Sequence, residues 1–407
     1  MYFLMQIRSL ISIVVKKNRD NTLNIYRELH FSKLFFLVLF TFFVVNTFAS
    51  VSYTTADEKE GHGVVYSKIS IKNGPVVIHQ LRIDLSSQDI EFSGGLANSY
   101  LGLGLAKTSQ IVEDEKQKGN KIIAAVNADF FGGFNPVFQN CMIIDGKFVK
   151  GVKMSRTLFA VNQQGEIRLN NYQFNGLSIF NNDTIVLNGL NVPIENNKCC
   201  FYNRYYRKMP VQNDSVTYWR IKPLGKSIID SICEYQIKEQ LMNPDSLNFV
   251  TGCEYLGVHN SLNSRFKIGD RIGIQLSVFP NEVHPQFMIG GLPRLIQNGR
   301  RITRFKNREG LTRKGFWKDR HPRTTIGIDH KNNYMYFVVV DGRQPGYSIG
   351  MSLKQLGKYL QKIGCDEALN FDGGGSSTMI LDQKIMNQPS DKEGERSVSN
   401  IFYIKKR

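Results

Sequence analysis

The sequence predicts an α+β fold, in which a large mixed, mostly antiparallel β-sheet is packed with few helices. Short runs of alternating or wholly apolar residues recur along the chain and are separated by turn residues. Hairpin signals such as Asp145-Gly146 join neighbouring runs, which favours antiparallel pairing. Apolar residues at helical spacing are sustained in few places, of which residues 352–363 are the clearest.

The first segment of the chain is typical of an export leader. Residues 35–45 are almost wholly apolar, and Thr47-Phe48-Ala49 follows them as a small-residue cleavage pattern. A run of this length is too short for a comfortable membrane span. We therefore expect residues 1–49 to be cleaved as a leader and residues 50–407 to be periplasmic, secreted or lumenal. Membrane contact is then transient, during export; an uncleaved leader that anchors the protein is the alternative.

The next strands are expected between residues 63 and 104, where short runs are apolar or alternate. A helix follows at about 109–118, and a buried strand at 121–126 leads into Asn127 and Asp129. Alternation resumes at 141–149 and at 158–169, around turns that contain glycine. Residues 170–260 are rich in Asn and Tyr and have the weakest secondary-structure pattern.

The last third of the chain has the clearest elements. A strong strand is predicted at 334–340. Ser352 opens the helix with Gln355 at the capping-box position, and Gly364 ends it. Short strands at 368–371 and 379–381 then flank a glycine-rich turn.

The charge balance of the chain is strongly basic, with 52 Lys and Arg residues against 35 Asp and Glu residues. A basic exported protein meets anionic partners such as phosphorylated glycans, wall polymers or lipid headgroups, although the balance could also serve solubility alone. Ten basic residues lie between 299 and 323. Because the chain has no nucleic-acid motif, we expect this run to be a mobile, solvated loop beside an anionic site and expect no nucleic-acid partner. The sequence predicts no oligomeric state.

All six cysteines follow the leader, and an even number in an exported chain permits disulfides. The middle four could join parts of the central segment, whereas Cys365 could equally be a buried free thiol. No Cys-x-x-Cys pair or other metal-ligand spacing is present in the sequence, so we predict no zinc site.

Three of the predicted apolar strands end at a carboxylate close to glycine: Asp129, Asp341 and Asp372. Arg323 and Thr324 adjoin a fourth strand. One such strand end is usually a turn, but three with an arginine predict a shared cleft.

A run of three glycines and three hydroxyl residues follows Asp372. Consecutive glycines suit a backbone that turns sharply or closely approaches another group. Their amides and the neighbouring hydroxyls would form a nest for an oxyanion, with Asp372 at its edge as acid, base or nucleophile. The structural alternative is a glycine-rich hairpin whose side chains cap backbone groups. The run consists of Gly373, Gly374, Gly375, Ser376, Ser377 and Thr378.

Six short motifs, taken together and in order, resemble the phosphodiester glycosidase family over about residues 63–404. Differences from the family pattern are Gln388, where Arg is frequent, Asn370-Phe371, and a local insertion at 207–250. The motifs lie at residues 127–131, 288–296, 321–327, 340–344, 370–378, and 387–391 with 396–400.

The resemblance implies that residues 50–407 form a catalytic domain that cleaves the bond between the anomeric carbon of a sugar and a phosphodiester oxygen. The substrate would be a phosphorylated glycan or a sugar-phosphate polymer. The departing phosphate monoester has a second pKa of about 6, so it needs charge compensation more than a general acid. Arg323 and the turn at 373–377 would hold the phosphate.

The sugar side of the reaction calls for carboxylates, and Asp372 and Asp129 are the candidates. Asp341 completes the expected catalytic set and would orient the substrate together with Arg343. Asn127, His321 and Thr324 are the further expected contacts to substrate or phosphate. No cofactor is expected to be required; a divalent cation is compatible with the sequence but is not indicated by it.

Two other functions fit the same residues. A metal-assisted phosphodiesterase would use the three carboxylates as metal ligands and would cut the P–O bond instead. A catalytically silent protein that binds phosphorylated glycans is the alternative without an enzymatic activity.

Overall fold

The computed structural model describes residues 53–61, 63–72, 74–132, 135–194, 198–207, 215–242, 252–263, 265–282 and 284–407. They belong to one unit, residues 53–407. The predicted leader and its cleavage point after Ala49 lie outside the described residues and stay predictions. Within the described ranges, no helix is long and apolar enough to cross a membrane.

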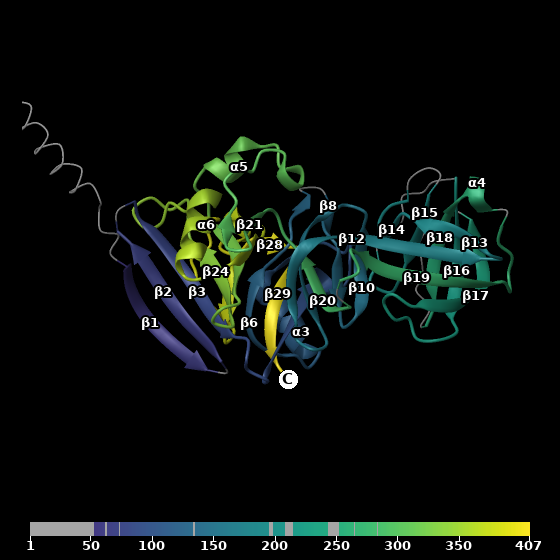
Figure 1. Cartoon of the computed structure of the whole chain (residues 1–407), viewed down its shortest axis with the longest axis horizontal. Helices are drawn as coiled ribbons and strands as arrows, with labels where there is room; N and C mark the ends of the chain where they lie inside the picture. Colours follow the sequence, from purple (N-terminus) through teal and green to yellow (C-terminus); the bar gives the residue numbers. More distant parts are fainter. Residues whose placement is uncertain are drawn as a thin grey trace, which may run out of the picture. The chain divides into compact units, whose positions relative to one another are not determined.

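The described chain is predominantly β (Figure 1). Its strands form sheets of eight, twelve and five strands and two small sheets, rather than the single large sheet that was expected. Among the described residues, every pairing of named strands but one is antiparallel, so the prediction of mostly antiparallel pairing is confirmed. The strands divide because a twisted open sheet of more than about ten strands tends to curl or to split into packed layers.

The eight-stranded sheet contains the strands predicted at 334–340 and 368–371. Across the sheet the order is β1 (Tyr53–Gly61), β2 (Val64–Ile71), β3 (Val76–Asp84), β24 (Tyr334–Val340), β23 (Arg323–Asp329), β25 (Glu367–Asn370), β21 (Arg294–Gln297) and β22 (Arg300–Arg301).

Helix α6 (Leu353–Lys362) lies against β21 of this sheet (Figure 1). The predicted capping box is present, since the Gln355 amide donates to Ser352 Oγ and the Ser352 amide donates to Gln355 Oε1. The apolar face of α6 is buried with Leu353, Leu356 and Leu360 in one core cluster with β21 and β24. The helix at 352–363 is therefore confirmed, and it fixes the sheet that ends at Asp372.

The five-stranded sheet contains the buried strand predicted at 121–126. The order across it is β27 (Lys384–Ile385), β26 (Met379–Leu381), β6 (Lys121–Asn127), β29 (Asn400–Lys406) and β4 (Ile90–Leu96). Helix α3 (Thr108–Gln117) covers this sheet with Ile111 and Val112, as the predicted helix at 109–118 requires.

The twelve-stranded sheet closes on itself, because β11 (Arg156–Asn162) pairs with both β20 (Pro285–Gly290) and β12 (Ile167–Phe180). The segment predicted as an insertion at 207–250 contributes β16 (Val216–Pro223) and β17 (Ile232–Met242) to it; whether that segment is an insertion stays a prediction. The order is β11 (Arg156–Asn162), β20 (Pro285–Gly290), β9 (Met142–Ile144), β10 (Lys147–Val152), β14 (Gly189–Leu190), β15 (Cys199–Tyr202), β18 (Glu254–His259), β16 (Val216–Pro223), β17 (Ile232–Met242), β19 (Arg271–Phe279), β12 (Ile167–Phe180) and β13 (Asp183–Leu187).

The small elements connect these sheets. They are α4 (Asn260–Asn263), α5 (Lys314–Lys318), the strand pair β5 (Ala106–Lys107) and β28 (Ser397–Val398), and the strand pair β7 (Phe131–Gly132) and β8 (Asn135–Phe138).

Phe402 on β29 lies where the three large sheets meet. Its ring centroid is 4.9 Å from that of Phe337 on β24, 5.0 Å from that of Phe159 on β11 and 5.1 Å from that of Phe287 on β20. Phe371, which directly precedes Asp372, packs edge-on against the same ring at 6.2 Å. The shared aromatic core thus links the position of Asp372 to all three sheets.

No disulfide supports the central segment within the described chain. Cys141, Cys199, Cys233, Cys253 and Cys365 are free thiols, so the disulfides that the sequence permitted are not formed. Cys141, Cys199 and Cys233 are buried in the core enclosed by the twelve-stranded sheet, and Cys365 is buried in the core beneath α6. The reading of Cys365 as a buried free thiol is confirmed.

Candidate active site

Three segments that are distant in sequence meet at the ends of β6, β23 and β25. The Asp372 amide donates to the Ala128 carbonyl at 2.8 Å, and the Phe371 amide donates to the Thr324 carbonyl at 2.8 Å. The structure thus brings two of the predicted strand-end carboxylates, Asp129 and Asp372, to one place beside the start of β23.

Asn127 joins these segments through its side chain, which is completely buried. Its Nδ2 donates to the Asp372 carbonyl at 2.7 Å, and its Oδ1 accepts from Thr324 Oγ1 at 2.7 Å and from the Thr378 amide at 3.1 Å. Asn127 and Thr324, expected as substrate contacts, therefore hold the carboxylate and the glycine turn in register.

Asp129 is buried, with 1% of its surface exposed. Its oxygens accept from the Phe130 amide at 2.7 Å, from the Asn140 amide at 2.8 Å and from Asn140 Nδ2 at 2.6 Å. These hydrogen bonds and the nearby Lys150 act to lower the pKa of this carboxyl. Burial outweighs them and raises the pKa to about 6.

Asp372 is half-buried and lies at the edge of the turn. Its Oδ1 accepts from the Gly373 amide at 2.9 Å. Burial raises the pKa of Asp372 to about 6, with a further contribution from the negative charge of Asp129, so the two carboxylates influence each other. The Ser376 hydroxyl favours the charged form of Asp372 by its proximity, although it makes no hydrogen bond of good geometry.

Each glycine of the turn is required by a close approach. A Cβ on Gly373 would lie 2.8 Å from the Pro322 carbonyl oxygen. Gly374 has a φ of +65°, and a Cβ there would lie 2.9 Å from the Arg343 guanidinium. A Cβ on Gly375 would collide with the ion pair of Asp391 and Arg396. The turn thus lies between the β23 backbone and two arginine side chains.

The hydroxyl groups of the turn are buried and lack partners. Ser376 Oγ, Ser377 Oγ and Thr378 Oγ1 have no hydrogen-bond partner among the described residues. Because buried polar atoms are almost always satisfied, three adjacent orphans after a glycine turn indicate a place for water or for ligand oxygens. The hydroxyls of the predicted oxyanion nest are therefore open, whereas the amides of Gly374, Ser376 and Ser377 already donate to protein carbonyls.

Arg323 is 3% exposed, and its guanidinium is bound largely to the protein itself. Nε donates to the Met351 carbonyl at 2.9 Å, and Nη2 donates to the carbonyls of Phe316 at 2.7 Å and Asp319 at 3.1 Å. Burial lowers the pKa of Arg323 to about 9, and the neighbouring Arg343 acts in the same direction. The expected phosphate clamp therefore also anchors α5.

Arg343 joins Arg323 in a positive cluster around the turn, and His321 lies beside both arginines. Arg343 is exposed and lies against Gly374. Burial lowers the pKa of His321, and both Arg323 and Arg343 act in the same direction. His321 Nδ1 is a further buried polar atom without a partner in the described chain.

Asp341 is placed differently from the other two carboxylates. Its Oδ2 accepts from His79 Nε2 and from the Tyr347 hydroxyl, each at 2.9 Å, and its Oδ1 accepts from Asn387 Nδ2 at 3.1 Å and from the Gln388 amide at 3.0 Å. These four hydrogen bonds use both oxygens of the Asp341 carboxylate as acceptors. Asn387 in turn donates to the Ser377 carbonyl at 3.0 Å, so Asp341 acts on the turn through Asn387.

Several side chains of the site had no role in the sequence interpretation. Lys150 is buried near Asp129, and burial lowers its pKa to about 8. Its Nζ donates to the carbonyl of Phe138, the last residue of β8, two residues before Asn140. Neither Lys150 nor His79 has a sequence signal, because each is one position in an ordinary alternating strand. Asn387 and Arg396 lie in two of the quoted motifs.

Among the described residues, no three His, Cys, Asp or Glu side chains come together as they would around a metal ion. Four cavities of the described chain are lined by other residues, and the candidate active site rests on its side-chain arrangement.

The family model for phosphodiester glycosidases matches residues 254–405 of this chain. The resemblance that the motifs indicated is confirmed over this region, which includes Arg323, Asp341 and the turn after Asp372, whereas Asp129 precedes it. A comparison with curated proteins finds no match.

Two solved structures share the fold, and a third is more distant. A hypothetical protein from Synechocystis has a TM-score of 0.71 at 19% identity; the alignment covers 88% of this chain and 64% of that one. A protein from Burkholderia pseudomallei that is described as exported has a TM-score of 0.63 at 18% identity, over 82% of this chain and 75% of that one. The zebrafish N-acetylglucosamine-1-phosphodiester α-N-acetylglucosaminidase catalytic domain, auto-inhibited by its pro-peptide, has a TM-score of 0.48 at 16% identity, over 88% of each chain.

Proposed function

We propose that this protein is a hydrolase that cleaves the glycosidic C–O bond of a sugar-1-phosphodiester and releases a phosphate monoester. One observation carries the proposal: a half-buried carboxylate, Asp372, directly precedes a glycine turn with three buried hydroxyls that lack partners among the described residues. The family match over residues 254–405 supports the reaction class.

In this proposal Asp372 acts at the anomeric carbon, since it is the more exposed of the two coupled carboxylates. Asp129, held by Asn140, stabilises the positive charge that develops on the sugar. The turn and Arg343 stabilise the negative charge that develops on the leaving phosphate, and Arg323 holds α5 in place beside them. Asp341 is a positioning residue in this scheme, because its oxygens are already engaged.

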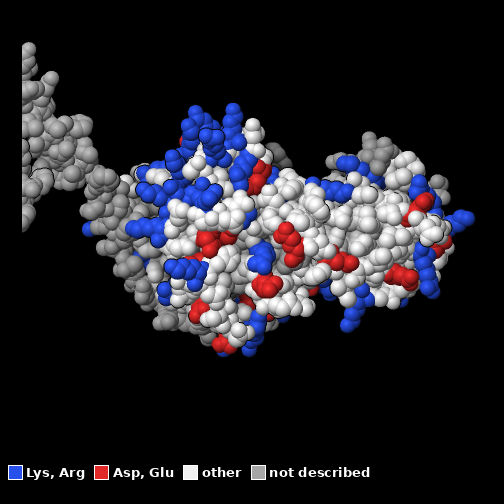
Figure 2. All heavy atoms as spheres, viewed as in Figure 1, with Lys and Arg blue, Asp and Glu red and all other residues white. Residues whose placement is uncertain are grey.

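A basic surface beside the site supports a polyanionic substrate, either a phosphorylated glycan or a sugar-phosphate polymer. Figure 2 shows Lys and Arg gathered over the region of α5. Phe316 of α5 packs against Phe130, the residue after Asp129, with ring centroids 5.7 Å apart. Positive potential next to a site raises the local concentration of anionic substrate.

The proposal includes the expected export, fold class and insertion of this chain. Residues 50–407 would be an exported catalytic domain of the α+β class, with 207–250 as a local insertion. The description of the Burkholderia protein as exported agrees with the expected leader. No cofactor is proposed.

We expect kcat/KM to fall as the pH falls through about 6. A phosphate leaving group needs little acid catalysis, so at least one carboxylate must act in its ionised form, and burial raises the pKa of both to about 6. Between pH about 4 and about 6 the folded chain keeps protons that the unfolded chain releases, so the free energy of unfolding should decrease as the pH rises. A pH profile of kcat/KM and urea unfolding at several pH values measure both. An acid limb near pH 4 would contradict the proposed carboxylates.

Hydrolysis of an α-sugar-1-phosphate diester in oxygen-18 water tests which bond breaks. Cleavage of the C–O bond places the label in the sugar, as proposed. Label in the phosphate, together with loss of activity in chelator, would instead support the metal-assisted phosphodiesterase. Binding of the diester without turnover would support the silent glycan-binding protein.

A further inference from the structure

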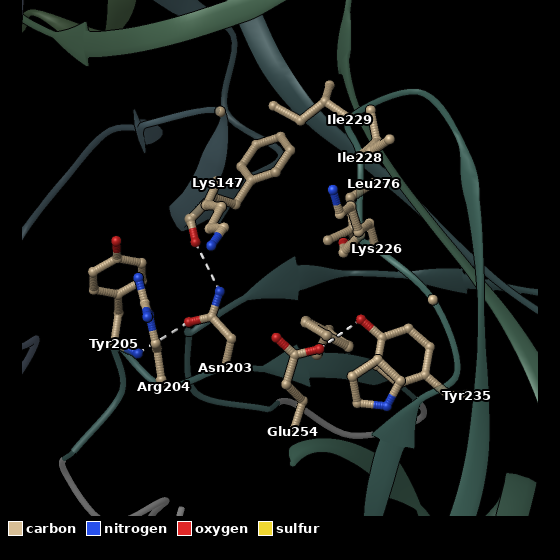
Figure 3. A pocket seen from close by; sticks show the side chains of 16 residues that line it. Lys147, Asn203, Arg204, Tyr205, Lys226, Ile228, Ile229, Tyr235, Glu254 and Leu276 are labelled. Carbon is tan, nitrogen blue, oxygen red and sulfur yellow. Dashed lines mark hydrogen bonds between the residues drawn. The ribbon is translucent and has the colours of Figure 1, made fainter. Parts of the chain in front are cut away.

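A cavity that is separate from the candidate active site is lined by strands of the twelve-stranded sheet (Figure 3). Its volume is about 410 Å³, within the range of small-molecule sites. Strands β10, β15, β17, β18 and β19 line it, together with the connection between β16 and β17. No residue assigned to the candidate active site is among the described residues that line it.

A carboxylate with one free oxygen lies inside this cavity. Glu254 Oε2 accepts from the Tyr235 hydroxyl at 2.5 Å, and Tyr235 itself is buried (Figure 3). No described group donates to Glu254 Oε1, so that oxygen remains available to a ligand hydroxyl. The partly exposed side chain of Tyr205 also lines the cavity and adds aromatic surface, of the kind on which a sugar ring packs, to its wall.

Among the described residues that line the cavity, three are cations and Glu254 is the single carboxylate. The cations are Lys147 on β10, Arg204 after β15 and Lys226 in the connection between β16 and β17. Figure 3 shows Arg204 and Lys226 on opposite sides of the cavity. Lys147 and Arg204 both act electrostatically on Glu254. Three positive charges against one negative charge favour an anionic ligand.

The connection between β16 and β17 forms a wall that is held at both ends. The Leu224 amide donates to the Glu234 carbonyl at 2.8 Å, and the Asp230 amide donates to the Leu276 carbonyl at 2.8 Å. Between these anchors, Ile228 lines the cavity although 58% of its surface is exposed. An apolar side chain left open beside cations and a carboxylate suits a ligand with both apolar and charged parts.

We propose that this cavity is a second ligand site, separate from the candidate active site, for a sugar that carries a phosphate or a carboxylate group. The cations bind the anionic group, Glu254 accepts from a sugar hydroxyl, and the aromatic and apolar wall contacts the ring. The proposal does not depend on the proposed hydrolase activity.

Calorimetric titration of the whole protein tests the site with α-D-glucose 1-phosphate, D-glucuronate, methyl α-D-glucopyranoside and inorganic phosphate. At least one charged sugar is expected to bind about tenfold more tightly than both the neutral glycoside and inorganic phosphate. Hydrogen–deuterium exchange should slow at residues 225–229 when that sugar is bound, which distinguishes this cavity from product binding at the active site.

The double variant Lys147→Glu with Lys226→Glu is expected to weaken binding at this site at least about tenfold. Lys222→Glu is the matched control, since this exposed lysine lies on β16 outside the cavity and should change the affinity less than about twofold. Glu254→Gln should reduce the preference for the charged sugar over inorganic phosphate. Thermal unfolding checks that each variant is folded.

Several results would overturn the proposal. They are equal binding of inorganic phosphate and the charged sugars, absence of binding by both charged sugars, and binding without slower exchange at residues 225–229. Equal losses in the double variant and in Lys222→Glu would also overturn it, as would unchanged binding of every probe by Glu254→Gln. Turnover of sugar-1-phosphodiesters is expected to be unchanged in the double variant, so a failure of this proposal and a failure of the proposed hydrolase are distinguishable.

Discussion

Asp372→Asn is expected to lower kcat/KM for a sugar-1-phosphodiester by about 10³-fold or more, equivalent to about 4 kcal/mol of transition-state stabilisation. Asparagine keeps the shape of the side chain and can still accept from the Gly373 amide through its oxygen. What it loses is the negative charge at the anomeric carbon. Substrate binding should therefore be largely kept, so that the loss appears in kcat rather than in KM.

Asp382→Asn is the matched control for this prediction. Asp382 is exposed, lies in the turn between β26 and β27, and has a φ of +46°, which asparagine tolerates well. Its replacement should leave kcat/KM within about twofold of the parent protein. Steady-state kinetics and a titration with a non-hydrolysed analogue measure both variants. If Asp372→Asn retained more than about a tenth of the activity, another group would have to act at the sugar.

Arg323→Lys is expected to be nearly as harmful as Arg323→Ala, with a loss of about 2–4 kcal/mol in the free energy of unfolding for each. The planar guanidinium donates to three carbonyls, of Met351, Phe316 and Asp319, and a single ammonium group cannot reach all three in the same geometry. Loss of these bonds frees α5, which lies beside Asp129 through the contact of Phe316 with Phe130. Activity should fall together with stability.

Urea unfolding and kcat/KM measure the effects on stability and on catalysis. Arg304→Ala serves as the control: Arg304 is an exposed residue of the same basic segment, and its loss should change stability by less than about 0.5 kcal/mol. Nearly full stability and turnover in the Arg323→Lys variant would show that neither the anchoring of α5 nor phosphate binding needs the guanidinium. The proposed phosphate contact of Arg343 would be unaffected by that result.

Local patterns in the sequence were sufficient to predict the helix, hairpin and strand ends that position the candidate active site. Helix α6 was predictable because Ser352 and Gln355 satisfy its first amides within one turn. The hairpin at Asp145-Gly146 was predictable because both residues adopt positive φ between β9 and β10. The placement of carboxylates after β6 and β25 followed from apolar strand patterns that end in polar residues.

The division into three sheets was not predictable from these patterns. An alternating strand specifies which residues are buried, but not which other strand it pairs with. Phe159, Phe371 and Phe402 read as ordinary core residues in the sequence, yet they mark the meeting point of the three sheets. The cysteines illustrate the same limit, because their number permitted disulfides, whereas in the folded chain Cys141, Cys199 and Cys233 are free thiols although they share one core.

By itself, the sequence determined that carboxylates end several strands, that one of them precedes a glycine and hydroxyl turn, and that an arginine opens the strand beside it. Only the tertiary structure decided what each group does. Asp341 is engaged by His79, which is 262 positions away in the sequence, and Arg323 is engaged by carbonyls of α5 and Met351, whereas Asp372 keeps an exposed edge. The reason is physical: strand patterns and turns arise from neighbouring residues, but burial, hydrogen-bond partners and pKa depend on groups that only the folded chain brings together.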